Sequence, residues 1–155
     1  MRMITALSIV LIAISALIFT ASCGGDEGCK PEELDCDGVC ITPIQPTAAA
    51  VTEQVLAKSC AQSVCHRGYT AQEGLSLADI EAVKAAVGTP SKQKEDVMLI
   101  KAGDAANSYL IHKMRNQNIA AVSSTGKASV MMPPNGLLCE PKIKAVEDWI
   151  NAGAN

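Results

Sequence analysis

Aromatic residues and long strand-forming runs are both scarce in this chain. Phe, Tyr and Trp make up 3% of the 155 residues, and the single phenylalanine, Phe19, lies near the start. No run that would suit a β-strand exceeds five residues, which argues against a fold built on a large sheet. From residue 48 onward the chain is rich in alanine and its apolar residues recur at helical spacing. We therefore expect one small all-α domain.

Positive charge is scarce as well. The formal net charge is -3, and no cluster of Lys and Arg stands out anywhere along the chain. A basic surface is the usual electrostatic signature of a protein that binds nucleic acid. The charge pattern therefore argues against nucleic acid as a partner.

The first twenty-three residues have the features of a secretory leader. An apolar run over residues 9 to 19 is too short for a comfortable transmembrane helix, and small residues follow it up to Cys23. Ala21 and Ser22 before Cys23 resemble a bacterial lipobox, which implies a lipidated cysteine at the mature N-terminus. We expect residues 1–22 to be a signal peptide, with an uncleaved anchor as the alternative. Lipidated Cys23 would place the protein in the cell envelope, on the periplasmic face or at the outer membrane.

Seven cysteines in a short secreted chain indicate an oxidising compartment, where disulfides persist. Residues 23–47 are rich in Gly, Pro and acidic residues, and we expect a lipid-anchored, Cys-rich tether there. The Asp-Gly pair between Cys36 and Cys40 is a turn signal, so a disulfide from this loop to Cys29 or Cys139 is expected. A zinc site formed by Cys29, Cys36 and Cys40 is the alternative.

Apolar periodicity and capping residues predict the helices of the domain, which we place at residues 48–155. Asp104 is a candidate N-cap, and Ser76 with Asp79 resembles a capping box. Residues 117–131 lack periodicity and are expected to form a surface loop. The predicted helices cover residues 48 to 62, residues 77 to 87, Asp104 to about Asn116, and Pro141 to just before Gly153, with residues 97 to 101 extended.

Two separate segments contain the atoms that can hold one haem. The segment Cys60-Ala-Gln-Ser-Val-Cys65-His66 provides two thiols and an imidazole, and Met132-Pro133-Pro134-Asn135 provides a thioether. Haem c is attached through two cysteines, and a histidine directly after the second cysteine ligates the iron. The sequence therefore predicts thioether bonds at Cys60 and Cys65, with His66 and Met132 as iron ligands. Met131 and His112 are the alternative distal ligands.

A disulfide between Cys60 and Cys65 is a further possibility, with His66 as an ordinary loop residue. Five residues of α-helix rise by about 7.5 Å, which exceeds the Cα separation that a disulfide tolerates. Such a bridge therefore requires the helix to end between the two cysteines.

These segments, in this order, together with the closing sequence from Asp148 to Ala154, resemble a class I c-type cytochrome over residues 51 to 155. The resemblance implies a helical domain with one covalent haem and a transient redox protein as partner. The usual motif has two residues between its cysteines, whereas this chain has four. A haem would also supply large apolar surface to a core that has few aromatic residues.

Three functions of different classes follow. The first is a lipid-anchored carrier that transfers single electrons through one haem and is not an enzyme. The alternative, motivated by the four-residue spacer, is a haem-free surface lipoprotein that is stapled by disulfides and acts as a binding or structural module. A peroxidase or oxidase is the third hypothesis, but Met132 would close the distal position that such enzymes need.

Overall fold

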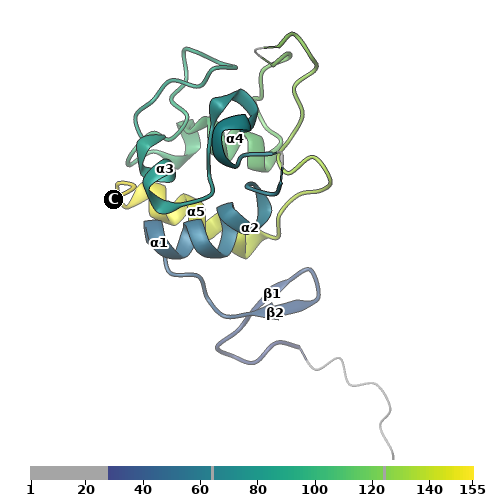
Figure 1. The fold of residues 1–155 in the computed structure, drawn as a ribbon. Helices are drawn as coiled ribbons and strands as arrows, with labels where there is room; N and C mark the ends of the chain where they lie inside the picture. Colours follow the sequence, from purple (N-terminus) through teal and green to yellow (C-terminus); the bar gives the residue numbers. More distant parts are fainter. Residues whose placement is uncertain (1–27, 64, 124) are drawn as a thin grey trace, which may run out of the picture.

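A computed structural model describes residues 28–63, 65–123 and 125–155 (Figure 1). The predicted signal peptide and Cys23 lie outside the described residues. In the described part, a small β-hairpin lies beside a body of short helices, and the loops between the helices cover the side of the body away from the hairpin. Within these ranges no helix is long and apolar enough to span a membrane.

The hairpin consists of β1 (Leu34–Cys36) and β2 (Val39–Ile41), which pair antiparallel. Asp37 and Gly38 form the turn with φ angles of 55° and 83°, as an Asp-Gly hairpin turn requires. The backbone N–H of Gly38 also donates to Oδ1 of Asp35 at 2.7 Å. The expected all-α class is therefore wrong: the fold is small and mixed, because turn chemistry and disulfides support strands that are too short to show as strand-forming runs.

Two disulfides hold the hairpin. Cys29 pairs with Cys40 inside the tether, and Cys36 pairs with Cys139, 103 residues further along the chain. The second disulfide joins β1 to the residue that precedes the last helix. The predicted set of disulfide cysteines is confirmed. The zinc alternative is wrong, because all three of its thiols are in disulfides.

The first helical segment begins at the predicted position and ends early. It comprises α1 (Ala48–Val51), a π-helical turn η1 (Thr52–Leu56) and α2 (Ala57–Ser59). Thr47 caps it, since its hydroxyl oxygen accepts from the backbone N–H of Ala50 at 3.2 Å. The helix ends at Ser59, with Cys60 as its C-cap, rather than at residue 62, so Cys65 and His66 lie outside it.

Short 3-10 turns and one helix follow the first helical segment. The turns are η2 (Gly68–Thr70) and η3 (Gln72–Gly74), and the helix is α3 (Ile80–Ala85). The expected capping box at Ser76 is wrong. Asp79 is the N-cap of α3, with its Oδ1 accepting from the backbone N–H of Ala82 at 2.8 Å. The predicted extended stretch at residues 97 to 101 is present only as two isolated bridges, Met98 with Pro90 and Ile100 with Val87.

The helix predicted to begin at Asp104 is divided into a 3-10 turn and an α-helix that starts after Ser108, whereas the final helix lies close to its predicted position. Asp104 caps the 3-10 turn η4 (Ala105–Asn107), and α4 (Tyr109–Arg115) ends at Asn116 with a φ of 53°. The final helix, α5 (Glu140–Asn151), has its proline in the first turn. Its buried face, which includes Trp149 at 1% exposure, packs in the core with residues of the first helical segment and of α4.

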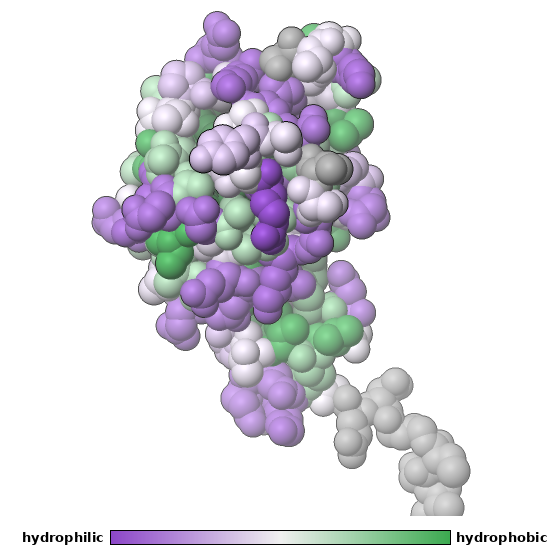
Figure 2. Space-filling model, viewed as in Figure 1, coloured by the Kyte–Doolittle hydropathy of each residue, from purple (hydrophilic) through white to green (hydrophobic). Residues whose placement is uncertain are grey.

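The guanidinium of Arg115 connects α4 to α5. It donates to Glu140 Oε1 at 2.8 Å and to Glu147 Oε2 at 2.9 Å. The hairpin differs from this packed body, because Leu34 and Val39 are 38% and 62% exposed and hydrophobic side chains are visible on its surface (Figure 2). The helical body thus has a core, whereas the hairpin depends on its disulfides.

Candidate functional site

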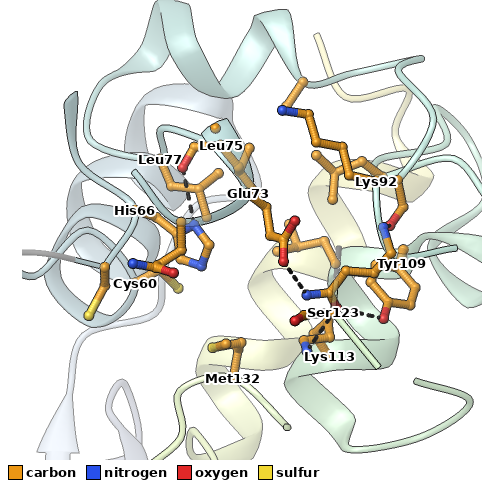
Figure 3. A pocket seen from close by; sticks show the side chains of 18 of the residues that line it. Cys60, His66, Glu73, Leu75, Leu77, Lys92, Tyr109, Lys113, Ser123 and Met132 are labelled. Atoms are coloured by element: carbon orange, nitrogen blue, oxygen red, sulfur yellow. Dashed lines mark hydrogen bonds between the residues drawn. The ribbon is translucent and has the colours of Figure 1, made fainter. Parts of the chain in front are cut away.

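A cavity of about 780 Å³ lies among the loops and helices of the body. Figure 3 shows Cys60 and His66 on one side of it, and Lys92 and Tyr109 on the other. Protein interiors contain few voids larger than a water molecule, and ligand pockets measure about 300–1,000 Å³. A cavity of this size is therefore typical of a binding site. Its apolar wall is formed by Leu75, Leu77, Ala86, Leu99, Leu110 and Met114.

His66 is buried in the wall of this cavity and is held on several sides. Its backbone N–H donates to Cys60 O at 3.1 Å, and its carbonyl accepts from the backbone N–H of Leu77 at 2.9 Å. The ring Nδ1 lies 3.1 Å from Leu75 O and donates to it, because a carbonyl only accepts. Burial lowers the pKa of His66, while hydrogen bonds with the backbone of Leu75 and Gln72 act in the opposite direction.

Cys60 and Cys65 both line the cavity and are free thiols in the structure, so the local disulfide considered from the sequence is not formed. Cys60 is 7% exposed, and Cys65 is half-buried. Burial, together with the nearby Cys65, raises the pKa of Cys60 to about 11. A protonated, buried thiol reacts slowly, so Cys60 is poorly placed for rapid exchange with external disulfides.

Met132 reaches the same cavity from the loop that follows α4. Its backbone N–H donates to Lys113 O at 2.9 Å, which fixes this part of the loop against α4. Met132 is half-buried and lines the cavity, as do Pro133 and Pro134. Met131 is absent from the lining among the described residues. The structure thus brings Met132 to the two thiols and His66, from far along the chain.

The other predicted candidate, His112, does not line the cavity in the described part of the chain. Its Nε2 lies 2.9 Å from Ala106 O, so this nitrogen is already engaged at the start of α4. Its ring meets Tyr109 edge-on, with a centroid separation of 6.1 Å. His112 is therefore a structural residue of α4 rather than part of the site.

A polar network occupies the opposite end of the cavity. The Gln93 side-chain oxygen accepts from Tyr109 Oη at 3.0 Å, from Ser129 Oγ at 3.0 Å and from Lys113 Nζ at 3.3 Å. Lys113 Nζ also donates to Ser129 Oγ at 2.9 Å, and Gln93 Nε2 donates to Glu73 Oε1 at 2.9 Å. The cavity therefore has an apolar body and one polar end.

Sequence reasoning missed this polar end. Gln93 and Ser129 lie in segments without periodicity and gave no signal. Lys113 did give one: it lies between the buried residues Leu110 and Met114, on a helix whose apolar face turns inward. A cation on the buried face of an amphipathic helix is rare unless it has a partner there, which marks the position as functional.

Comparison with known proteins finds no match among protein-family models, curated proteins or solved structures. In the described ranges, no three His, Cys, Asp or Glu side chains gather as a possible metal site, and four of the cysteines form two disulfides. The predicted membership of the class I c-type cytochromes is therefore wrong. The sequence segments behind this prediction are short, and each alone is weak evidence for a family. The spacing between Cys60 and Cys65 also departs from the usual motif. The function has to be argued from the cavity itself.

Proposed function

We propose that this protein is a binding module, stapled by two disulfides, that encloses an apolar ligand in its cavity. The observation that carries the proposal is the cavity of about 780 Å³, whose wall combines aliphatic and sulfur-containing side chains. Such a wall desolvates an apolar ligand, while a few polar groups at one end fix its orientation. The rigid frame needed for this role comes from the packed core around Trp149 and Ile150.

The proposal includes attachment to the cell envelope through a lipid on Cys23. This part rests on the sequence before residue 28. A tethered module of this kind would hold its ligand near a membrane surface and would need no reaction chemistry of its own. In this proposal the helical body contains the cavity, and the Cys-rich tether connects it to the lipid on Cys23.

A second candidate is that the ligand is a haem, and one observation favours it. Cys60, Cys65, His66 and Met132 all line the one cavity, and His66 has its Nδ1 held by a backbone carbonyl. A metal-ligating histidine typically donates its second ring N–H in this manner, which orients the ring. These residue types fit the group: the thiols would bind it covalently, and His66 with Met132 would ligate its iron. When bound, haem would supply a one-electron couple for exchange with a redox protein.

One preparation tests both candidates. The full chain is expressed in a host with working haem-attachment machinery, and its visible spectrum, its mass under denaturing conditions and its free thiols are measured. A colourless protein with two free thiols and no added mass beyond lipid supports a haem-free module. A mass increase of one haem, lost in Cys65→Ser, supports the second candidate.

The cavity itself is tested by filling it. Ala82 on α3 lines the cavity, whereas Lys84 on the same helix is exposed and outside the lining. We expect the neutral dye Nile red to bind the ligand-free chain and Ala82→Trp to weaken this binding at least about tenfold, since the indole takes up ligand volume. Lys84→Trp is the matched control and should bind as the unmodified chain does. Equal binding by the two variants, or no binding by any chain, would contradict the proposal.

A further inference from the structure

The charged residues of the cavity are mostly positive, although the whole chain is negative. Lys92, Lys113 and Lys127 line the cavity together with one acidic residue, Glu73, so positive charges exceed negative ones by two. The formal net charge of the chain is -3. Three of the 13 Lys and Arg residues therefore gather around one cavity, which favours a ligand of opposite charge.

Lys113 is the most unusual of these cations, because it is 7% exposed. Its ammonium donates hydrogen bonds to the neutral oxygens of Gln93 and Ser129. Removing an ammonium from water is costly, and neutral acceptors return only part of that cost. Accordingly, burial lowers the pKa of Lys113, while the charge of Glu73 acts in the opposite direction.

The network fixes the Lys113 ammonium at the polar end of the cavity. Tyr109 and Ser129 both donate to the same Gln93 oxygen, which Lys113 also contacts, so the three donors converge on one place. Tyr109 Oη is itself held, since it accepts from the backbone N–H of Ala120 at 3.1 Å. Tyr109 and Ser129 each donate their one hydroxyl proton to Gln93, whereas the Lys113 ammonium has three N–H donors and uses two of them in this network. Lys113 can therefore donate a charge-assisted hydrogen bond to a carboxylate, which is the strong form of hydrogen bond.

We propose that the natural ligand is an amphipathic carboxylate, whose apolar body fills the cavity and whose carboxylate binds to the Lys113 ammonium. This inference rests on the proposed binding function and adds the ligand class to it. Two kinds of molecule share this chemistry: a long-chain fatty acid, and a porphyrin that carries carboxylate side chains. Both combine an extended apolar body with an anionic end.

The test compares each acid with its neutral ester. Binding of palmitate and methyl palmitate, and of protoporphyrin IX and its dimethyl ester, is measured by equilibrium dialysis on the ligand-free full chain at neutral pH. We expect at least one acid to bind about tenfold or more tightly than its ester, because a charge-assisted hydrogen bond is lost in the ester. The pair that shows this preference identifies the ligand source.

Substitutions of single lysines show which side chain is responsible for the preference for the acid. Lys113→Met keeps approximately the length of the side chain and removes its charge, so it should abolish the preference for the acid over the ester. Lys84→Met, at an exposed lysine outside the lining, is the matched control and should retain the preference. Lys92→Met and Lys127→Met should reduce the preference less than Lys113→Met does, because both lysines are exposed.

Different experimental results would overturn this inference and the proposed binding function. Equal affinity of the acids and their esters for the unmodified chain would overturn the inference and leave the binding function in place. Retention of the preference in Lys113→Met would also overturn it. If no acid, ester or neutral dye binds, the binding function itself is wrong.

Discussion

The hairpin and the cavity both contain cysteines, and they use them in opposite ways. Both hairpin cysteines, Cys36 and Cys40, are in disulfides, and the side chains around them are largely exposed. The two cavity cysteines are free and lie in the wall of a preformed site. In the hairpin, which lacks a core, disulfides supply the stability. In the helical body, which has a core, Cys60 and Cys65 remain available to a ligand.

The strongest test of this contrast removes the disulfide between Cys36 and Cys139, which links the hairpin to the helical body. Cys36→Ser with Cys139→Ser opens a link between residues 103 apart, and we expect the free energy of unfolding to fall by about 2–5 kcal/mol, because the unfolded chain gains entropy. Urea denaturation measures the loss. Cys29→Ser with Cys40→Ser, which opens a link across only 11 residues, is the matched control and should cost about 1–2 kcal/mol less. Equal losses would contradict this account.

The reactivity of the cavity thiols sharpens the comparison. The pKa of Cys60 is raised from 9.0 to about 11, so its thiolate fraction at pH 8 is about a hundredfold lower than that of an unperturbed thiol. In ligand-free Cys65→Ser, the contribution of Cys65 is removed but the burial remains, so we expect Cys60 to react with iodoacetamide at least about tenfold more slowly than a peptide thiol. Cys60→Ser reports on Cys65, which is half-buried and should react faster. If Cys60 and Cys65 react with iodoacetamide at comparable rates, burial does not control the reactivity of these thiols.

The smallest expected effect is the pH dependence of stability that arises from His66. Burial lowers the pKa of His66 below 6.5, so the unfolded chain binds the proton more readily. The stabilisation is complete above pH 6.5 and is lost as pH falls toward the lowered pKa, with a slope of at most about 1.4 kcal/mol per pH unit. Urea denaturation in a His112→Gln background leaves His66 as the single histidine. His66→Gln should flatten this part of the profile, whereas the hairpin disulfides contribute no such slope.

Local signals in the sequence predicted the ends of several helices. Asp104, Asn116 and the proline of α5 act through the nearest backbone groups, so their roles can be recognised without the fold. The cap of α3 shows the limit of this approach. The backbone N–H of Leu77, next to Ser76, donates to His66 O, so tertiary contacts hold this segment in the cavity loop and the helix starts later, at Asp79.

The candidate site was predictable in part. Cys60, Cys65, His66 and Met132 were selected by residue type and spacing, and the structure does place all four around one cavity. Their spacing carried no information on the polar end, because Gln93 and Ser129 reach it from irregular loops. The family assignment failed for a related reason, since short patterns in the right order do not determine a fold. The disulfide partners also depended on how the hairpin lies against α5, which composition does not reveal.

The bond between Cys36 and Cys139 also determines where a mechanical load enters the body. Residues before β1 are joined to the body by two routes, the backbone into α1 and this covalent bridge to the start of α5. A pull on the N-terminal side is therefore shared between two elements that pack together in the core. Under the proposed anchoring at Cys23, the load therefore enters the body at α1 and at Cys139, and not at His66 or Met132.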